Sequence, residues 1–139
     1  MDAKATWKHG LSFTGVADSG FQIPLGVIKE QGGEDDGPRP MELLLVGLCG
    51  CTGMDAISIM LKKKQDVTAF EVRAHAERAD EHPRVFTHIT LEYIFTGHNL
   101  DRAAAERSVE LSATKYCPAQ AMFGKCLPID LKVTLVEAA

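Results

Sequence analysis

Alternating apolar and polar side chains predict β-strands at the start of the chain, in its middle and at its end. Three short runs near the start alternate in this way, at residues 3–8, 11–16 and 21–27. Gly10 and Gly20 supply turn residues between them. We therefore expect an N-terminal β-meander over residues 1–28.

A long apolar segment over residues 40–64 predicts the main helix of the fold. A polar loop rich in Gly and Pro precedes it, and Pro40 suits a first helical turn because its missing N–H would have no partner there. Glu42 lies in the same turn, where a negative charge complements the helix dipole. We expect this helix to be the central element.

The helix is apolar on nearly every side, because Asp55 is the only charged residue between Leu43 and Leu61. Such a helix is either buried or spans a membrane. The charge of Asp55, the glycines of the segment and the lack of a second apolar span favour burial, and we expect no membrane partner. We expect a partner subunit to complete its cover, with Leu48 and Ile57 at that contact.

The second half of the chain predicts a β-hairpin over residues 69–96, helices over 101–126 and a closing strand over 129–136. Asp101 is a suitable N-cap, and Pro118 interrupts the helical stretch. The second hairpin strand is expected to place one set of side chains on a common face: Val85, Thr87, Ile89, Leu91, Tyr93 and Phe95. The whole pattern predicts an α+β fold in a single domain, residues 1–139.

Composition excludes some partners and favours one compartment. The net charge of −4 argues against nucleic acid, which binds basic surfaces. The N-terminal residues carry no apolar signal segment, so we expect a cytoplasmic protein. In that compartment the four cysteines are expected to be thiols rather than structural disulfides.

Two cysteines are candidates for redox chemistry. Cys51 lies in the apolar helix, and Cys117 directly precedes Pro118. If the fold brings them together, one thiolate can be oxidised and the other thiol can resolve it as a disulfide. The start of the next helical turn is expected to lower the pKa of Cys117. A packed, inert Cys51 is the open alternative.

The other two cysteines, Cys49 and Cys126, are interpreted as structural or spare thiols. The cysteine spacings lack the short pairs of structural zinc sites, so we expect no metal and no cofactor. Asp55 lies four residues after Cys51, on the same helix face, and is a candidate for holding hydrogen bonds at the site.

Several motifs together resemble the OsmC/Ohr family, which comprises osmotically inducible protein C and the organic hydroperoxide resistance proteins. They are the Pro-Met-Glu-Leu-Leu-Leu run from Pro40, the Cys51 to Asp55 spacing and the Tyr-Cys-Pro around Cys117. Arg78 after Glu77, with the His-Pro-Arg-Val run that follows, looks closest to a less characterised OsmC-like branch. The resemblance implies an OsmC-like fold: antiparallel sheets wrapped around the central helix, in an intertwined homodimer.

The resemblance also implies a thiol-dependent peroxidase in oxidative-stress defence. Cys51 matches the family's peroxidatic cysteine and Cys117 its resolving cysteine. The substrate would be a small organic hydroperoxide, and a dithiol reductant would reopen the disulfide.

Better-known members pair an N-terminal arginine with the glutamate that opens the helix. Glu42 fits the second role, but no arginine precedes Arg39. Lys8, Arg39 and Arg78 are the candidate substitutes, and Arg39 lies next to the helix start.

The alternative function is a non-catalytic dimeric stress or binding protein. It would hold an apolar ligand at the dimer interface and would not need either cysteine.

Overall fold

The computed structural model describes residues 1–139 as two compact units, Met1–Val46 and Gly47–Ala139. The long helix α1 (Pro40–Lys62) begins in the first unit and continues through the second. Its start at Pro40 agrees with the prediction. The single domain expected for residues 1–139 stays a prediction.

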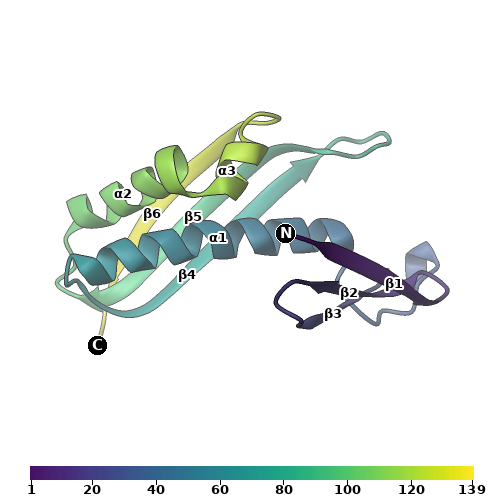
Figure 1. Cartoon of the computed structure of the whole chain (residues 1–139). Helices are drawn as coiled ribbons and strands as arrows, with labels where there is room; N and C mark the ends of the chain where they lie inside the picture. Colours follow the sequence, from purple (N-terminus) through teal and green to yellow (C-terminus); the bar gives the residue numbers. More distant parts are fainter. The chain divides into compact units, whose positions relative to one another are not determined.

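The first unit contains an antiparallel three-stranded sheet in the order β1-β2-β3 (Figure 1). Its elements are β1 (Ala3–His9), β2 (Ser12–Ala17), β3 (Gln22–Leu25) and the short 3-10 helix η1 (Lys29–Gln31). The loop after η1 packs back on the sheet, since Ser12 Oγ donates to Asp36 Oδ2 at 2.6 Å. The strand order agrees with the predicted meander.

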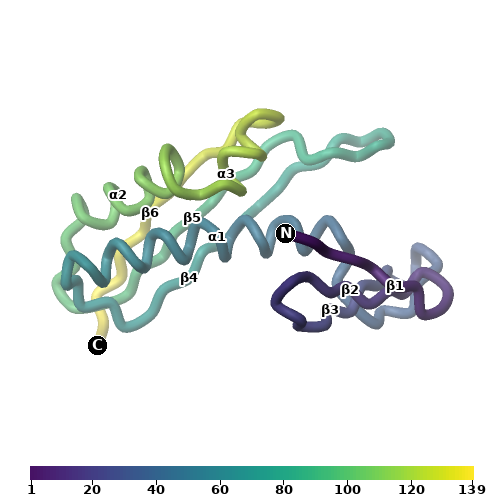
Figure 2. Tube along the Cα trace, viewed as in Figure 1, coloured from purple at the N-terminus to yellow at the C-terminus, as the bar shows by residue number.

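The second unit places helices against a three-stranded sheet in the order β4-β5-β6 (Figure 2). Its strands are β4 (Asp66–Arg78), β5 (Phe86–His98) and β6 (Ile129–Glu137). Between β5 and β6 lie α2 (Arg102–Leu111), the π-helical turn η2 (Ser112–Tyr116) and α3 (Pro118–Phe123). The two sheets and the long helix confirm the predicted α+β class.

The direction of β6 differs from the expected antiparallel sheets. β4 is antiparallel to β5, but β6 is parallel to β5. The helices between β5 and β6 carry the chain back along the sheet, so the next strand starts at the same end as β5. Alternation in a sequence shows that a strand exists and does not show its direction.

The core of the second unit lies between the sheet and the helices. Four side chains of β5 are fully buried on one face: Ile89, Leu91, Tyr93 and Phe95. Leu48, Ala56 and Met60 of α1 are buried too. Gly53 lets α1 approach β4 closely, because a Cβ there would lie 3.2 Å from Val72 Cγ2.

The start of β5 differs from the predicted pattern. Val85 is 52% exposed and precedes the strand, whereas Phe86 is buried. Glu77 pairs with His88 and Arg78 pairs with Phe86, so a β-bulge at Thr87 shifts the alternation by one residue. The expectation that Val85 and Thr87 lie on the same face as the four residues from Ile89 to Phe95 is therefore wrong.

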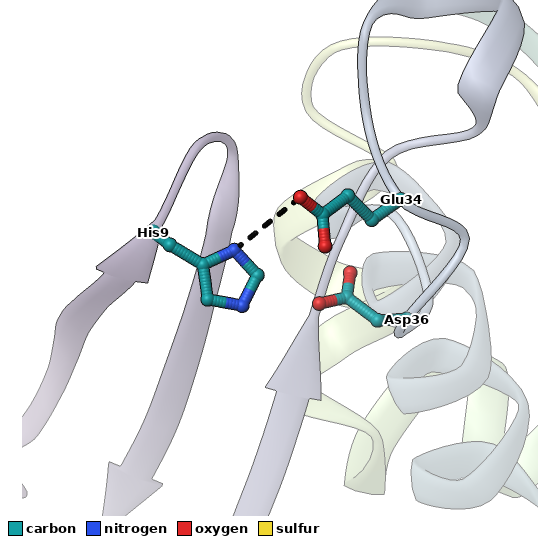
Figure 3. Close-up of side chains that lie close together, drawn as sticks. All are labelled: His9, Glu34 and Asp36. Atoms are coloured by element: carbon teal, nitrogen blue, oxygen red, sulfur yellow. Dashed lines mark ion pairs between the residues drawn. The ribbon is translucent and has the colours of Figure 1, made fainter.

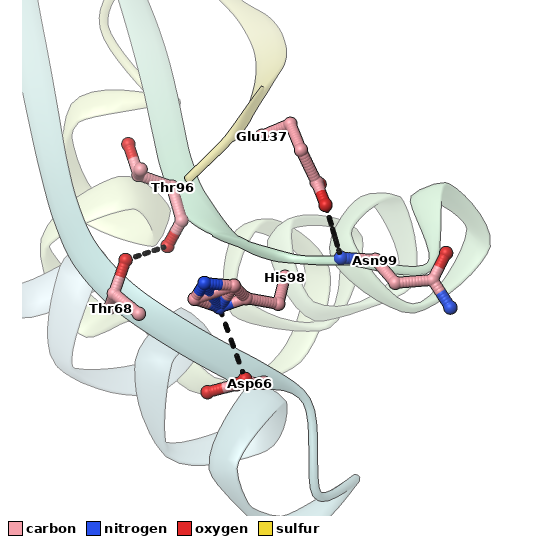
Figure 4. Close-up of polar contacts among 6 residues, drawn as sticks. All are labelled: Asp66, Thr68, Thr96, His98, Asn99 and Glu137. Atoms are coloured by element: carbon pink, nitrogen blue, oxygen red, sulfur yellow. Dashed lines mark hydrogen bonds and ion pairs between the residues drawn. The ribbon is translucent and has the colours of Figure 1, made fainter. Parts of the chain in front are cut away.

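Polar contacts fix the other end of this sheet (Figure 4). The backbone N–H of Asn99 donates to both carboxylate oxygens of Glu137 at 3.1 Å. His98 Nδ1 lies 3.3 Å from Asp66 Oδ2. These contacts join the turn after β5 to the end of β6 and the start of β4.

Within the second unit, α1 is only partly covered. Leu48 is fully buried in its own chain, while Met54 is 73% and Leu61 58% exposed. The sequence-based choice of Leu48 as a partner contact is therefore wrong, because this side chain belongs to the core. By length and composition alone α1 could also cross a membrane, since an 18-residue window within it has a mean hydropathy of 1.8.

Candidate functional site

The site is built around Cys51 and Cys117, which come from different elements. Cys51 lies on α1 and is partly exposed, whereas Cys117 is the N-cap residue of α3 and is 3% exposed. Pro118 starts α3, which keeps Cys117 in extended backbone conformation. The backbone N–H of Cys117 donates to Ser112 O at 2.9 Å and ties it to η2.

The structure brings the two cysteine side chains together. Cys51 acts on Cys117 through a side-chain hydrogen bond and through charge, and both effects raise the pKa of the Cys117 thiol. Contacts of this kind require neighbouring sulfur atoms. The two thiols are therefore close enough to affect each other, and both are free in this structure.

The pKa of Cys117 moves opposite to the predicted direction. Burial is the largest cause, and it raises this pKa from 9.0 to about 11. The backbone N–H of Gln120 donates to Cys117 Sγ at 3.3 Å and opposes the rise. The expected lowering is wrong because the few N–H groups of a short helix do not compensate for desolvation.

The remaining cysteines, Cys49 and Cys126, form no hydrogen bond with Cys51 or Cys117, although a charge on Cys49 raises the pKa of Tyr93. Burial raises the pKa of the Cys49 thiol. Cys126 is exposed, and its sulfur faces Met122 O at 4.0 Å. Neither contact gives these thiols a chemical role.

A buried network of polar side chains lies beside the cysteine pair. Thr52 Oγ1 lies 2.6 Å from the Tyr93 hydroxyl and 2.7 Å from Ser112 Oγ. Gln120 Nε2 donates to Thr52 Oγ1 at 2.8 Å and to the Tyr93 hydroxyl at 2.9 Å. The network therefore joins α1, β5, η2 and α3 around the position of Cys117.

Tyr93 is strongly affected by this environment. The pKa of its hydroxyl is raised to about 12; burial is the largest cause, and a charge on Cys117 contributes to the rise. The hydroxyl therefore stays protonated at neutral pH. It is a hydrogen-bond donor and acceptor close to the Cys117 sulfur.

Asp55 connects the network to the surface. Ser112 Oγ donates to Asp55 Oδ2 at 2.9 Å. Asp55 also lines a surface hollow of about 320 Å³, together with Ser58, Ile59, Lys62, Leu111 and Tyr116. The sequence-based candidate thus lies at the outer end of the buried network.

Arg39 and Glu42 form an ion pair in the first unit. Arg39 Nη2 lies 3.2 Å from Glu42 Oε1, and the backbone N–H of Arg39 donates to Glu42 Oε2 at 2.8 Å. The backbone donor is the largest cause of the lowered pKa of Glu42, and the Arg39 side chain comes next. The arrangement is half of a capping box at the start of α1.

Arg78 has other partners. Its Nε donates to Arg84 O at 3.0 Å, and its guanidinium lies 5.9 Å from the centre of the Phe86 ring. These contacts hold the β4–β5 loop. None of them reaches Cys51, Cys117 or Asp55.

A separate group of side chains that could hold a metal ion lies in the first unit (Figure 3). His9 Nδ1 lies 3.6 Å from Glu34 Oε1, and the carboxylate of Asp36 faces the same imidazole ring. Ligand atoms of the three residues all lie within 4.8 Å of one another. Sequence spacing gave no signal for this cluster, because the three residues meet only through folding of the loop.

Sequence reasoning also missed the buried network. Thr52 gave the one usable signal, since it is a hydroxyl residue inside an apolar helix. Ser112 and Gln120 look like ordinary polar positions of a helical stretch. Tyr93 was placed correctly on the buried face of its strand, without a role for its hydroxyl.

Comparison with known proteins gives consistent results over the whole chain. The family model described as OsmC-like protein matches residues 33–132. Protein YhfA of Escherichia coli strain K12 is 41% identical over 138 residues, which is 99% of this chain and 100% of that protein.

Solved structures give the same fold. A hypothetical protein from Aquifex aeolicus VF5 has a TM-score of 0.86 at 26% identity, over 99% of this chain and 97% of that one. An organic hydroperoxide resistance protein OsmC from Legionella pneumophila has a TM-score of 0.71 at 20% identity, over 96% and 95% of the two chains.

Proposed function

Because the chain belongs to the OsmC-like protein family, we propose that it is a thiol-dependent peroxidase for small organic hydroperoxides. The family includes proteins named for organic hydroperoxide resistance. Cys51 is the proposed peroxidatic residue and Cys117 the resolving one. The proposed setting is a cytoplasmic homodimer with a dithiol reductant.

The observation that carries this proposal is the contact between the Cys51 and Cys117 side chains. Their environments differ in a way that suits two roles. Cys117 keeps its proton at neutral pH, because its pKa is about 11, and it lies within hydrogen-bonding reach of Cys51. Cys51 is the more exposed residue of the pair, which supports its assignment as the residue that meets the substrate.

The proposed reaction has three steps. The Cys51 thiolate attacks one oxygen of the hydroperoxide, the O–O bond breaks, and the alcohol leaves with a proton while Cys51 becomes a sulfenic acid. Cys117 then attacks the Cys51 sulfur, forming the S–S bond and releasing water. A dithiol reductant finally reduces the disulfide to two thiols and becomes a disulfide itself.

Arg39 and Glu42 are proposed as the ion pair that orients the hydroperoxide. Their pairing supports this role, since a guanidinium held by a carboxylate offers N–H donors in fixed positions. Asp55 is proposed to act through Ser112 rather than on the substrate. Arg78, with its loop contacts, is the weakest of the proposed site residues.

Steady-state consumption of cumene hydroperoxide with a dithiol reductant tests the proposal. Cys51→Ser should abolish turnover, and Cys117→Ser should leave a single oxidation event without turnover. Cys126→Ser is the matched control, because that thiol is exposed and lies outside the pair. Equal turnover in Cys51→Ser and the wild-type protein would exclude the proposal.

A non-catalytic binding function is the second candidate. It is favoured by an apolar hollow of about 380 Å³ in the first unit, lined by Ala3, Lys4, Ala5, Gly15, Val16, Ala17, Ile23, Leu25 and Leu43. This function predicts that an apolar molecule co-purifies with the protein. It predicts the same molecule, found by mass spectrometry, when Cys51 and Cys117 are both serine.

A further inference from the structure

The hydroxyl groups of the buried network are hydrogen-bonded in series. The series runs from Tyr93 through Thr52 and Ser112 to Asp55, with successive separations of 2.6, 2.7 and 2.9 Å. Tyr93, Thr52 and Ser112 are fully buried. Asp55 reaches a surface hollow, so the series connects the interior with solvent.

The direction of each hydrogen bond follows from the number of hydrogens available. Ser112 has one hydroxyl hydrogen, and its acceptors are Asp55 Oδ2 at 2.9 Å and Thr52 O at 3.4 Å. With either acceptor, that hydrogen is not available to Thr52 Oγ1. Thr52 must therefore donate to Ser112.

The same count fixes the inner half of the series. The single Thr52 hydrogen is used toward Ser112, so Tyr93 must donate to Thr52. Gln120 uses both Nε2 hydrogens, one toward Thr52 and one toward Tyr93. Thr52 Oγ1 then accepts two hydrogen bonds and donates one, which satisfies it completely. Every hydroxyl hydrogen in the series points toward Asp55.

The inner end of the series adjoins Cys117. Gln120 contacts both groups: its backbone N–H donates to Cys117 Sγ at 3.3 Å and its Nε2 to the Tyr93 hydroxyl at 2.9 Å. The Tyr93 oxygen keeps an acceptor site, since Gln120 occupies only one. Charges on Cys117 and on Cys49 both raise the pKa of the Tyr93 hydroxyl, and Cys117 has the larger effect.

We propose that Tyr93, Thr52, Ser112 and Asp55 form a one-way proton relay that carries the proton of Cys117 to solvent while Cys117 resolves oxidised Cys51. The inference rests on the proposed Cys51–Cys117 redox pair. It assigns the four residues as positioning and proton-transfer residues. The relay requires the S–H of Cys117 to donate to the Tyr93 hydroxyl as Cys117 attacks the oxidised sulfur.

The relay would provide a route for proton loss from Cys117, whose thiolate is otherwise rare at neutral pH. With a pKa of about 11, Cys117 is ionised in only about one molecule in ten thousand at pH 7. In the relay, the S–H proton passes to Tyr93 while Tyr93, Thr52 and Ser112 each pass one proton onward. Asp55 receives the last proton and releases it to solvent. The Cys117 sulfur then forms the S–S bond, and hydroxide leaves the sulfenic acid and takes a proton to become water.

Asp55 is the acceptor, so the charged groups around it matter for the pH dependence. Lys62 lines the same hollow from α1, and Tyr116 lines it from η2. Ser112 faces Asp55 from η2, and Cys51 lies four residues earlier on α1. Lys62 is the one cationic side chain among the residues that line the hollow.

An aromatic disulfide reagent tests the relay without any hydroperoxide. Cys51 attacks the reagent first and releases one coloured aromatic thiolate. Cys117 then attacks the mixed disulfide at Cys51, releasing a second thiolate and one net proton. Stopped-flow absorbance separates the two phases, and the second phase reports the proton loss from Cys117.

Two variants break the relay at different places. Asp55→Asn keeps an acceptor for Ser112 but removes the proton acceptor, and Ser112→Ala breaks the series while keeping the charge of Asp55. Both should slow the second phase about tenfold or more and leave the first within about twofold. If Asp55 acted only through its negative charge, Asp55→Asn would have the opposite effect. Removing that charge would favour the Cys117 thiolate and speed the second phase. Asp55→Glu should restore much of the rate.

The pH profile gives a second readout. In the wild-type protein the second phase should change little with pH around neutrality, because Asp55 accepts the proton. In Asp55→Asn it should rise about tenfold per pH unit, since only solvent hydroxide then removes the proton. Glu106→Gln on α2 removes one charge at an exposed position and should match the wild-type profile.

The outcomes distinguish the relay from the proposed function. Unchanged second-phase rates and pH profiles in Asp55→Asn and Ser112→Ala, with a Cys51–Cys117 disulfide formed, would overturn the relay alone. Failure of the wild-type protein to form that disulfide would overturn the redox pair and the relay together.

Discussion

Burial keeps the Cys117 thiol protonated, and this single property has a consequence for stability. The pKa of this thiol rises from 9.0 to about 11 in the folded protein. Between those values the folded protein binds a proton that the unfolded chain has lost. The corresponding stability is complete below about pH 9 and is lost as the pH rises toward 11.

Cys117→Ser should therefore flatten the loss of stability between pH 9 and 11. The expected difference in unfolding free energy across this range is at most about 3 kcal/mol. Urea unfolding at a series of pH values measures it, with Cys126→Ser as the exposed control. Tyr93, with a pKa of about 12, contributes a similar loss at higher pH in every variant. Parallel curves for Cys117→Ser and the wild-type protein would contradict the burial argument.

The Arg39–Glu42 pair offers a second test at the residue scale. The pair is exposed, so Glu42→Gln should cost less than about 1 kcal/mol of stability. If the pair orients the hydroperoxide, the same change should lower kcat/KM about tenfold or more. The exposed Arg102–Glu106 pair on α2 supplies the control, Glu106→Gln. An unchanged kcat/KM would leave Glu42 as a helix-capping residue only.

At the scale of elements, the polar network holds α1 against β5, η2 and α3. Thr52 is its centre, with hydrogen bonds to Tyr93, Ser112 and Gln120. All three hydrogen bonds are buried, so water cannot replace the Thr52 hydroxyl when a mutation removes it. Each group left without a partner then costs stability.

Thr52→Val should destabilise the protein by about 1–3 kcal/mol, because it keeps the shape of the side chain but leaves its buried hydrogen-bond partners unpaired. Urea unfolding measures the loss. Thr114→Val is the matched control, since Thr114 Oγ1 only donates to Glu110 O on an exposed surface. Equal stabilities of the two variants would show that the network adds little to the packing of α1.

The sequence predicted where helices and strands begin better than it predicted strand direction and register. Pro40 and Glu42 marked the start of α1, and Asp101 marked the start of α2, where its side chain accepts from Ala103 N at 3.2 Å. The direction of β6 was missed because a strand's alternation is the same in either direction. Val85 was misplaced because a bulge shifts the period by one residue, and no residue type at Thr87 indicates it.

In the candidate site, too, the sequence identified some residues but not the contacts that the fold creates between them. Motifs identified Cys51 and Cys117, but their meeting depends on the fold. The pKa direction of Cys117 was wrong, because a sequence shows the helix start and not the burial that outweighs it. Ser112 and Gln120 could not be identified at all, since their role depends on partners from other elements.

At the scale of the whole molecule, the uncovered side of α1 supports a homodimer. Met54 and Leu61 are apolar and largely exposed in the single chain. Apolar side chains exposed along one helix are typical of an interaction surface. The proposed partner is a second copy of this chain, as the family resemblance implies.

Met54→Glu should shift the protein from dimer to monomer in sedimentation or light scattering, because a buried, unpaired charge opposes association. Val85→Glu is the control, since Val85 is also exposed and apolar but lies in the β4–β5 loop. A dimer of unchanged stability in Met54→Glu would place the interface elsewhere or exclude it.

The most direct test of the account is the fate of the two sulfurs after one equivalent of cumene hydroperoxide. The account predicts that peptide mass spectrometry finds a disulfide between Cys51 and Cys117, and that Cys117→Ser stops at a sulfenic acid on Cys51. Recovery of both residues as free thiols, with the hydroperoxide unconsumed, would contradict it.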